Sequence, residues 1–256
     1  MMGAKEKGFL DGTTKMIIFV TMIDFGTLHM PTTEPAALTA AKWTDWPAHS
    51  WMLVACAFII LIILPEIGKL LPALTGCLTR SRGNLEVEHS ISTARSRNHI
   101  ARMLGLIFLV IADRYCIYDP SFIAPWNEVW LRLGELTAVA VAYLILRHTL
   151  HAVLLRIGHR RLHPETMTAV RRGFYNYFIC FVLLALVSIC ILCIFNAGDV
   201  VCRNVIWAEL ALLWLVALIR EGQILQSNFS VLTTILYLCG LEIIPTGALV
   251  ASGLML

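Results

Sequence analysis

The sequence predicts an all-α, polytopic membrane helix bundle, and three observations support that prediction. Of the 256 residues, 58% are hydrophobic and only 14% are charged, against roughly 25% charged in an ordinary soluble domain. The mean hydropathy is +0.76. Several apolar stretches are about as long as a helix that crosses a bilayer, and they lack the alternation of polar and apolar residues found in membrane β-barrels. Lipid is therefore the expected solvent.

The chain is expected to have an extracytoplasmic tail and a transmembrane bundle. The tail, residues 1–46, contains one short apolar piece, Met16 to Ile23, which is too short to span and is expected at the membrane interface. The bundle, residues 47–256, is expected to contain about six transmembrane helices, at about 46–64, 100–118, 132–155, 174–195, 201–219 and 229–253. The second span is the weakest, because its uncharged part is short.

Basic residues predict the orientation of these spans. The loops after the first, third and fifth spans hold more Lys and Arg than the tail and the other loops. Because cytoplasmic loops are enriched in basic residues, the N-terminus and the C-terminus are both expected outside. The same bunching favours a membrane partner, and no nucleic acid partner is expected.

Intramembrane charges are the main candidate site. Counting about 1.5 Å per residue along each helix places three acids at one level near the outer surface, with a neighbouring pair on the same side. These residues are Glu135, Glu209 and Glu242, with Asp113 and Arg114. Two interpretations stay open, since a carboxylate in lipid must face a partner or a wet cavity. The acids could form a proton or cation relay, or they could pair with Arg114, Arg132 or Arg203 and lock the helices together.

The last span and the inner end of the third span hold further candidates. Pro245 is expected to kink the last helix close to Glu242, because proline removes a backbone hydrogen bond. Arg147, His148 and His151 form an inner basic cluster, expected at the lipid headgroups. A metal site using the two histidines with His159 or His163 is the less favoured alternative, so no metal and no cofactor is expected.

Two of the eight cysteines are candidates for a disulfide. Cys116 and Cys202 both fall in predicted outer loops, where an oxidising compartment would permit a bond between the second and fifth spans. Two free thiols are the alternative. Cys190 and Cys193 form a C-x-x-C pair deep in the fourth span, which indicates packing, because redox motifs lie at accessible helix starts.

The last helix resembles a known family. Leu238, Cys239, Leu241, Glu242, Ile243 and Pro245 match the form Leu-Cys-x-Leu-Glu-Ile-x-Pro, which is similar to the final helix of uncharacterised multi-span inner-membrane proteins of Bacteroidota, a domain of unknown function. The similarity covers mainly the last two spans. It implies a bacterial inner membrane and supplies no catalytic residues.

These observations predict a non-enzymatic inner-membrane subunit. No nucleophile elbow, phosphate loop, HExxH or paired-aspartate signature is present, so no catalytic residue is assigned. The expected role is an accessory or scaffold component of a larger envelope complex, in protein export or envelope biogenesis, with the lipid bilayer and other envelope subunits as partners. The alternative is a proton- or cation-coupled transporter that uses Glu135, Glu209 and Glu242.

Overall fold

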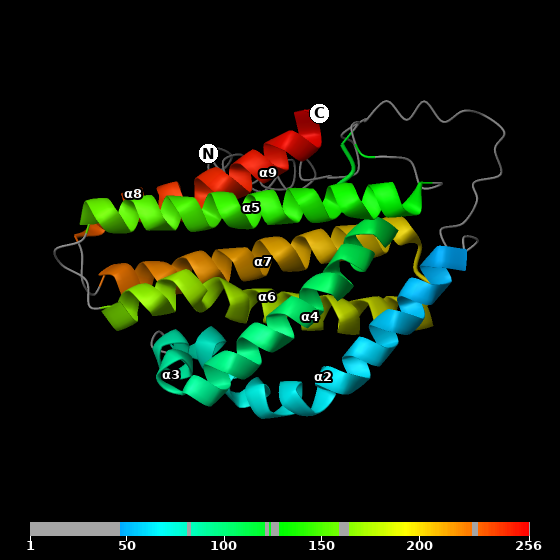
Figure 1. The fold of residues 1–256 in the computed structure, drawn as a ribbon, viewed down its shortest axis with the longest axis horizontal. Helices are drawn as coiled ribbons and strands as arrows, with labels where there is room; N and C mark the ends of the chain where they lie inside the picture. The colour runs from blue at the N-terminus through cyan, green and yellow to red at the C-terminus, as the bar shows by residue number, and fades with distance from the viewer. Residues whose placement is uncertain are drawn as a thin grey trace, which may run out of the picture. The chain divides into compact units, whose positions relative to one another are not determined.

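The computed structural model describes residues 47–80, 83–120, 123, 128–158, 164–226 and 230–255, and nearly all of these residues are helical (Figure 1). The predicted all-α fold is confirmed. The N-terminal tail, with the interfacial piece expected at 16–23, lies outside the described residues.

The helices follow one another with short connections. They are α2 (Pro47–Thr79), α3 (Gly83–His89), α4 (Ile91–Arg114), α5 (Val129–Gly158), α6 (Pro164–Ile194), α7 (Asp199–Gln226), α8 (Val231–Leu238), the π-helical segment η2 (Cys239–Ile243) and α9 (Ile244–Met255). Within the described part of the chain, five helical stretches are long and apolar enough to cross a membrane: Ala48–Thr79, Val129–Val153, Arg172–Ile194, Asp199–Gln226 and Val231–Gly253.

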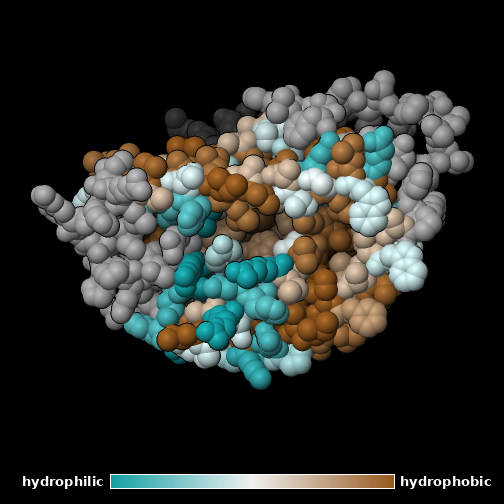
Figure 2. Space-filling model, in the orientation of Figure 1, coloured by the Kyte–Doolittle hydropathy of each residue, from teal (hydrophilic) through white to brown (hydrophobic). Residues whose placement is uncertain are grey.

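Helix α4 differs from the second span that the sequence predicted. It begins nine residues before Ile100, and its first half is polar, so it is not among the five candidate spans. One side packs into the core through Ile100, Leu104 and Ile107, while the other exposes Ser92, Arg95, His99 and Arg102. Figure 2 shows hydrophilic residues gathered over α3 and the N-terminal half of α4. Only the part of α4 from 103 to 112 is therefore apolar on all sides.

Contacts between helix ends show that α4 nevertheless runs the whole length of the bundle. Its C-terminal Asp113 meets Arg132 at the start of α5 and His49 at the start of α2. Near its other end, Arg97 pairs with Glu88 of α3, which also contacts Arg172 of α6. These contacts define the Asp113 end and the Glu88 end of the bundle.

Both ends of the described chain lie at the Asp113 end. His49 of α2 contacts Asp113, and Ser252 of α9 is hydrogen-bonded to Tyr118 in the turn after α4, at 2.8 Å between the hydroxyl oxygens. At the Glu88 end, the Arg220 guanidinium of α7 donates to the last carbonyls of α2. Chain direction therefore alternates from α2 through α4, α5, α6 and α7 to α8–α9, six traverses in the described residues.

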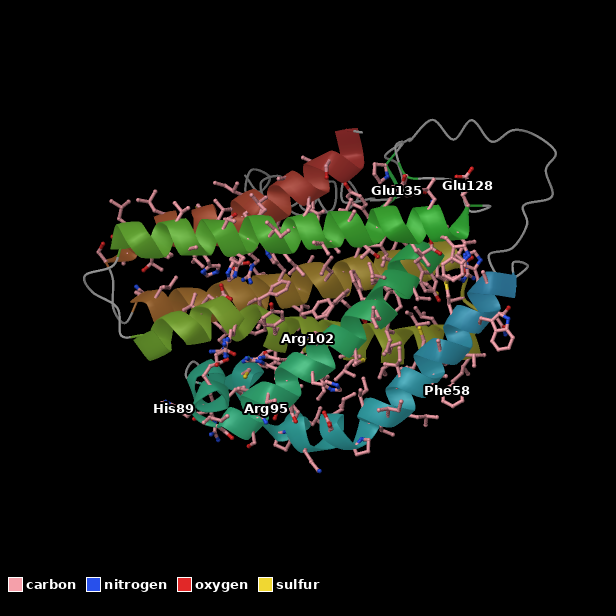
Figure 3. All side chains as sticks on the ribbon, viewed as in Figure 1. Phe58, His89, Arg95, Arg102, Glu128 and Glu135 are labelled. Carbon is pink, nitrogen blue, oxygen red and sulfur yellow. The ribbon has the colours of Figure 1, made fainter. Side chains whose placement is uncertain are left out.

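The core lies between α2, α4, α6 and α7. Its most buried members include Ile63, Leu74, Leu104, Ile179 and Ile206. The outer surface is apolar as well: Ile62 is exposed, and so is Phe58, which is labelled in Figure 3. Apolar surface exposed on helices long enough to cross a membrane belongs in contact with a lipid bilayer, so the chain is a multi-pass membrane protein.

The turn after α4 needs a left-handed residue. The N–H of Ile117 donates to the carbonyl of Ala112, and the N–H of Cys116 donates to that of Asp113, which is the Schellman pattern of helix termination. Cys116 accordingly has a φ of 46°. A side chain in this conformation is strained, because its Cβ approaches the following carbonyl oxygen.

Replacing Cys116 by glycine should therefore stabilise the protein relative to replacing it by alanine. Both substitutions remove the thiol, but only glycine relieves the strain. We therefore expect the free energy of unfolding of the Gly variant to be about 1 kcal/mol higher than that of the Ala variant. Unfolding curves in mixed micelles measure the difference. A more stable Ala variant would contradict the cap geometry.

Candidate functional site

The last helix is interrupted where Glu242 lies. Pro245 has no N–H, and its ring would clash with the carbonyl four residues back in a regular helix. The helix avoids this clash by forming the π-helical segment Cys239–Ile243. After this segment, the N–H of Ile244 donates to the carbonyl of Cys239, five residues back. The distortion predicted near Pro245 thus precedes the proline and contains Glu242. Single π-helical turns of this kind are frequent at functional sites.

Arg147 of α5 holds the Glu242 carboxylate. Its Nη2 donates to Oε1 of Glu242, and both side chains are about 95% removed from solvent. The guanidinium carbon also lies 4.3 Å from the ring centroid of Phe174 on α6. The ion pair is dehydrated, and a cation over an aromatic face gains further electrostatic stabilisation.

Glu221 of α7 completes this group, which we call the Arg147 site: Arg147, Glu221 and Glu242. The Glu221 side chain is 2% exposed, and its carboxyl group lies close enough to Glu242 and Arg147 to interact electrostatically with both. Helix α6 passes close beside it, because a Cβ on Gly173 would lie 3.5 Å from Oε1 of Glu221 and 3.0 Å from Nδ2 of Asn84. Three helices therefore bring one basic and two acidic groups together inside the bundle.

Polar groups surround the Arg147 site. Tyr143 of α5 and Thr246 of α9 have their hydroxyl oxygens 3.5 Å apart. Beyond Gly173, the Asn84 amide of α3 donates to Tyr177, and Asn176 donates to Asn84 at 3.0 Å. The site is thus one end of a buried polar layer in the half of the bundle that faces the Glu88 end.

A second charged group lies at the Asp113 end. The buried Asp113 carboxylate accepts from Nε of Arg132 at 2.6 Å, and Nε2 of His49 lies 3.5 Å away. Arg132 also contacts Asp119 at 2.9 Å. Neighbouring Arg114 makes a two-pronged contact with Asp199 of α7, at 3.0 and 3.1 Å. These pairs join the start of α5 and the start of α7 to the end of α4.

The three acids predicted at one level do not lie together, so that prediction is wrong. Glu135 is near the start of α5 (Figure 3), about 18 Å along the helix from Arg147, to which Glu242 is bound. Glu209 accepts a hydrogen bond from Ser188 of α6, and is about 18 Å along α7 from Glu221. The depth count failed because Glu242 lies about halfway along the last helix, whereas Glu135 lies near the start of α5.

The inner basic cluster is also divided. Arg147 was expected at the lipid headgroups but is buried in an ion pair, so that prediction is wrong. His148 is exposed and His151 is buried, although they are three residues apart on α5. His159 and His163 lie outside the described residues. Among the residues that the structure does describe, no group of three His, Cys, Asp or Glu side chains is arranged to hold a metal ion.

Cys116 and Cys202 are both free thiols and form no disulfide with each other, which is the second of the two alternatives given above. Cys202 is buried in the first turn of α7, beside Tyr115. Cys116 lies in the turn after α4, where burial raises the pKa of its thiol to about 11. Burial likewise raises the pKa of the Tyr115 phenol to about 12. Cys190 and Cys193 are also free, inside α6.

The raised pKa predicts slow alkylation of Cys116. A higher pKa leaves less of the reactive thiolate at a given pH, so at pH 8 the folded chain should react about 100-fold more slowly than an ordinary cysteine. The rate should rise about tenfold per pH unit until it levels off near the pKa of about 11. A chain that keeps only Cys116, compared with its detergent-unfolded form, gives the measurement. Equal rates would contradict the burial of this thiol.

Sequence reasoning missed Glu221. The stretch Arg220-Glu221-Gly222 resembles the polar end of a span, but α7 continues to Gln226. The signal was the apolar pair that follows it, Ile224 and Leu225, since both are buried and continue the helical spacing of the buried face.

No family model, no curated protein and no solved structure matches this chain. The fold and the site define its class as a multi-pass, all-helical membrane protein with paired charges in its interior. The resemblance of the last helix to the Bacteroidota family stays a prediction, since these comparisons bear on it in neither direction.

Proposed function

We propose that the protein is a non-enzymatic subunit of a larger envelope assembly in a bacterial inner membrane. The observation that supports this most is the exposed polar stripe of α4, formed by Ser92, Arg95, His99 and Arg102. Figure 3 shows Arg95 and Arg102 along this helix, away from Glu135 at the start of α5. Arg102 lies about halfway along a helix that runs from one end of the bundle to the other.

An arginine exposed at that depth needs a polar neighbour. In hydrocarbon, an uncompensated charge costs at least about 3 kcal/mol. A second protein with acidic or carbonyl groups facing the stripe would remove that cost, and it would make α4 the contact surface of a subunit. In this proposal, the interior charge pairs fix the helices so that the stripe is presented rigidly.

The setting that we propose is protein export or envelope biogenesis, as expected from the sequence. Transport by Glu135, Glu209 and Glu242 has less support. The three acids lie at different positions along the bundle, and Glu242 is paired with Arg147. They therefore do not form one path along which a proton or cation would move.

Purification of the native protein in mild detergent tests the proposal. We expect the chain to migrate with at least one partner, well above its own mass of 28.6 kDa. The double variant Arg95→Gln and Arg102→Gln should lose that partner while keeping its thermal stability. Arg203→Gln, which removes a basic residue from α7 at the Asp113 end, is the matched control and should keep the partner. A homogeneous particle of the chain alone, from native membranes, would contradict the proposal.

A further inference from the structure

The exposed side of α4 has the spacing of a helix-packing surface. Beyond Ile91, its exposed residues recur at alternating intervals of three and four positions. They are Ser92, Arg95, His99, Arg102 and Leu106, and we call them the α4 seam. Residues with this heptad spacing stay in contact with one neighbouring helix over their whole length. At about 100° per residue, the seam covers an arc of only about 80° around the helix, which suits a single further helix.

The other sides of α4 are already covered. This helix contacts α2, α3, α5 and α6, and its buried residues include Ala94, Ala101 and Leu104. The surface beside the α4 seam is open by contrast, because a Cβ on Gly105 would lie more than 4 Å from every atom of the other described helices. Small residues at such positions let a second membrane helix approach closely. The seam is therefore the side of α4 on which a helix from another chain can pack.

Two arginines give the α4 seam a charge that the described residues do not compensate. Within that part of the chain, the side chains of Arg95 and Arg102 form no hydrogen bond and no ion pair. His99 between them has an acidic neighbour, since its Nδ1 lies 3.7 Å from Oε2 of Glu66 on α2. Arg95 and Arg102 are seven positions apart, which is about 10 Å along the helix. The uncompensated charges therefore repeat with the heptad interval of the seam.

We propose that the α4 seam binds one transmembrane helix of the partner, and that this helix carries two acidic residues seven positions apart, opposite Arg95 and Arg102. The same interval on both helices lets the two ion pairs form in one arrangement. Each pair removes the cost of an arginine and of an acid facing hydrocarbon. This inference rests on the proposed function, because it specifies the partner's contact element.

The depth of Arg102 favours a helix over a lipid headgroup as the source of the negative charge. Arg102 lies about halfway along α4, a helix that runs from one end of the bundle to the other. Phospholipid headgroups lie at the surfaces of the bilayer, outside its hydrocarbon core. A transmembrane helix carries its side chains through that core, so it can place an acid opposite Arg102.

Designed transmembrane peptides test the proposal. The full chain, in nanodiscs of phosphatidylcholine, is titrated with fluorescent peptides of leucine and alanine that contain two glutamates. In the heptad peptide the glutamates are seven positions apart and share one face. In the control peptide they are five positions apart and lie on opposite sides. We expect the heptad peptide to bind about tenfold more tightly, because only it forms both ion pairs at once.

The double variant Arg95→Gln and Arg102→Gln should abolish this preference, and Arg203→Gln is the matched control that should keep it. Equal binding of the two peptides, or a preference that survives in the double variant, would overturn the proposal. Loss of the preference when phosphatidylglycerol is added would assign the arginines to lipid headgroups and overturn it as well. Co-purification of a native partner together with equal peptide binding would refute this inference alone, whereas a native particle of the chain alone would contradict the proposed function.

Discussion

Replacing Arg147 by methionine should destabilise the protein by about 3–5 kcal/mol, the usual cost of removing one partner of a buried ion pair. The substitution leaves the buried Glu242 without its cation, in an interior where Glu221, a second buried acid, interacts with it. It also removes the cation from the face of the Phe174 ring. Reversible unfolding in mixed lipid and detergent micelles measures the loss.

Arg114→Met is the matched control for this effect. Arg114 also pairs with an acid on another helix, but its partner Asp199 is 64% exposed. An exposed pair contributes about 1 kcal/mol or less. Equal losses in the two variants would show that the burial of the Arg147 pair has no energetic consequence.

The second large effect is expected at Asp113. Asp113→Ala removes the carboxylate that Arg132 and His49 face, while Asp119 remains for Arg132. We expect a loss of about 3 kcal/mol, because the buried guanidinium of Arg132 loses its buried carboxylate partner, while Asp119, its other acidic partner, is exposed. The same unfolding assay measures it.

The double variant Asp113→Ala and Arg132→Met provides the control. Removing both members of the pair leaves no buried guanidinium that has lost its carboxylate, so the double variant should be more stable than Asp113→Ala alone. A loss equal to the sum of the two single variants would contradict direct coupling between these residues.

The sequence predicted the fold well because apolar length is a local property. The spans expected at 46–64, 132–155, 174–195, 201–219 and 229–253 each fall largely within a helix that can cross a membrane. The exception, 100–118, lies in α4, whose polar first half is tolerated because its opposite face packs on α2 and α6. Tertiary packing of this kind leaves little trace in a hydropathy pattern.

The candidate site could be predicted only in part. Glu242 and Pro245 were visible as an acid and a proline inside an apolar helix, and Arg147 was visible as a basic residue in another. Whether Arg147 and Glu242 pair depends on the axial offset between α5 and the last helix, which no local sequence pattern specifies. Glu221 was missed for a related reason. A polar triplet in the sequence is the same whether the helix ends there or continues and packs against a neighbouring helix.

Cross-linking between α5 and the last helix tests most directly where these elements meet. In a cysteine-free background, the pair Tyr143→Cys and Thr246→Cys replaces two residues whose hydroxyl oxygens are 3.5 Å apart. The pair Glu135→Cys and Thr246→Cys has its α5 partner about 12 Å further along the helix. A thiol cross-linker about as long as a tyrosine side chain should join the first pair and leave the second unjoined. Faster cross-linking of the second pair would place Glu242 near Glu135 and contradict the Arg147 site.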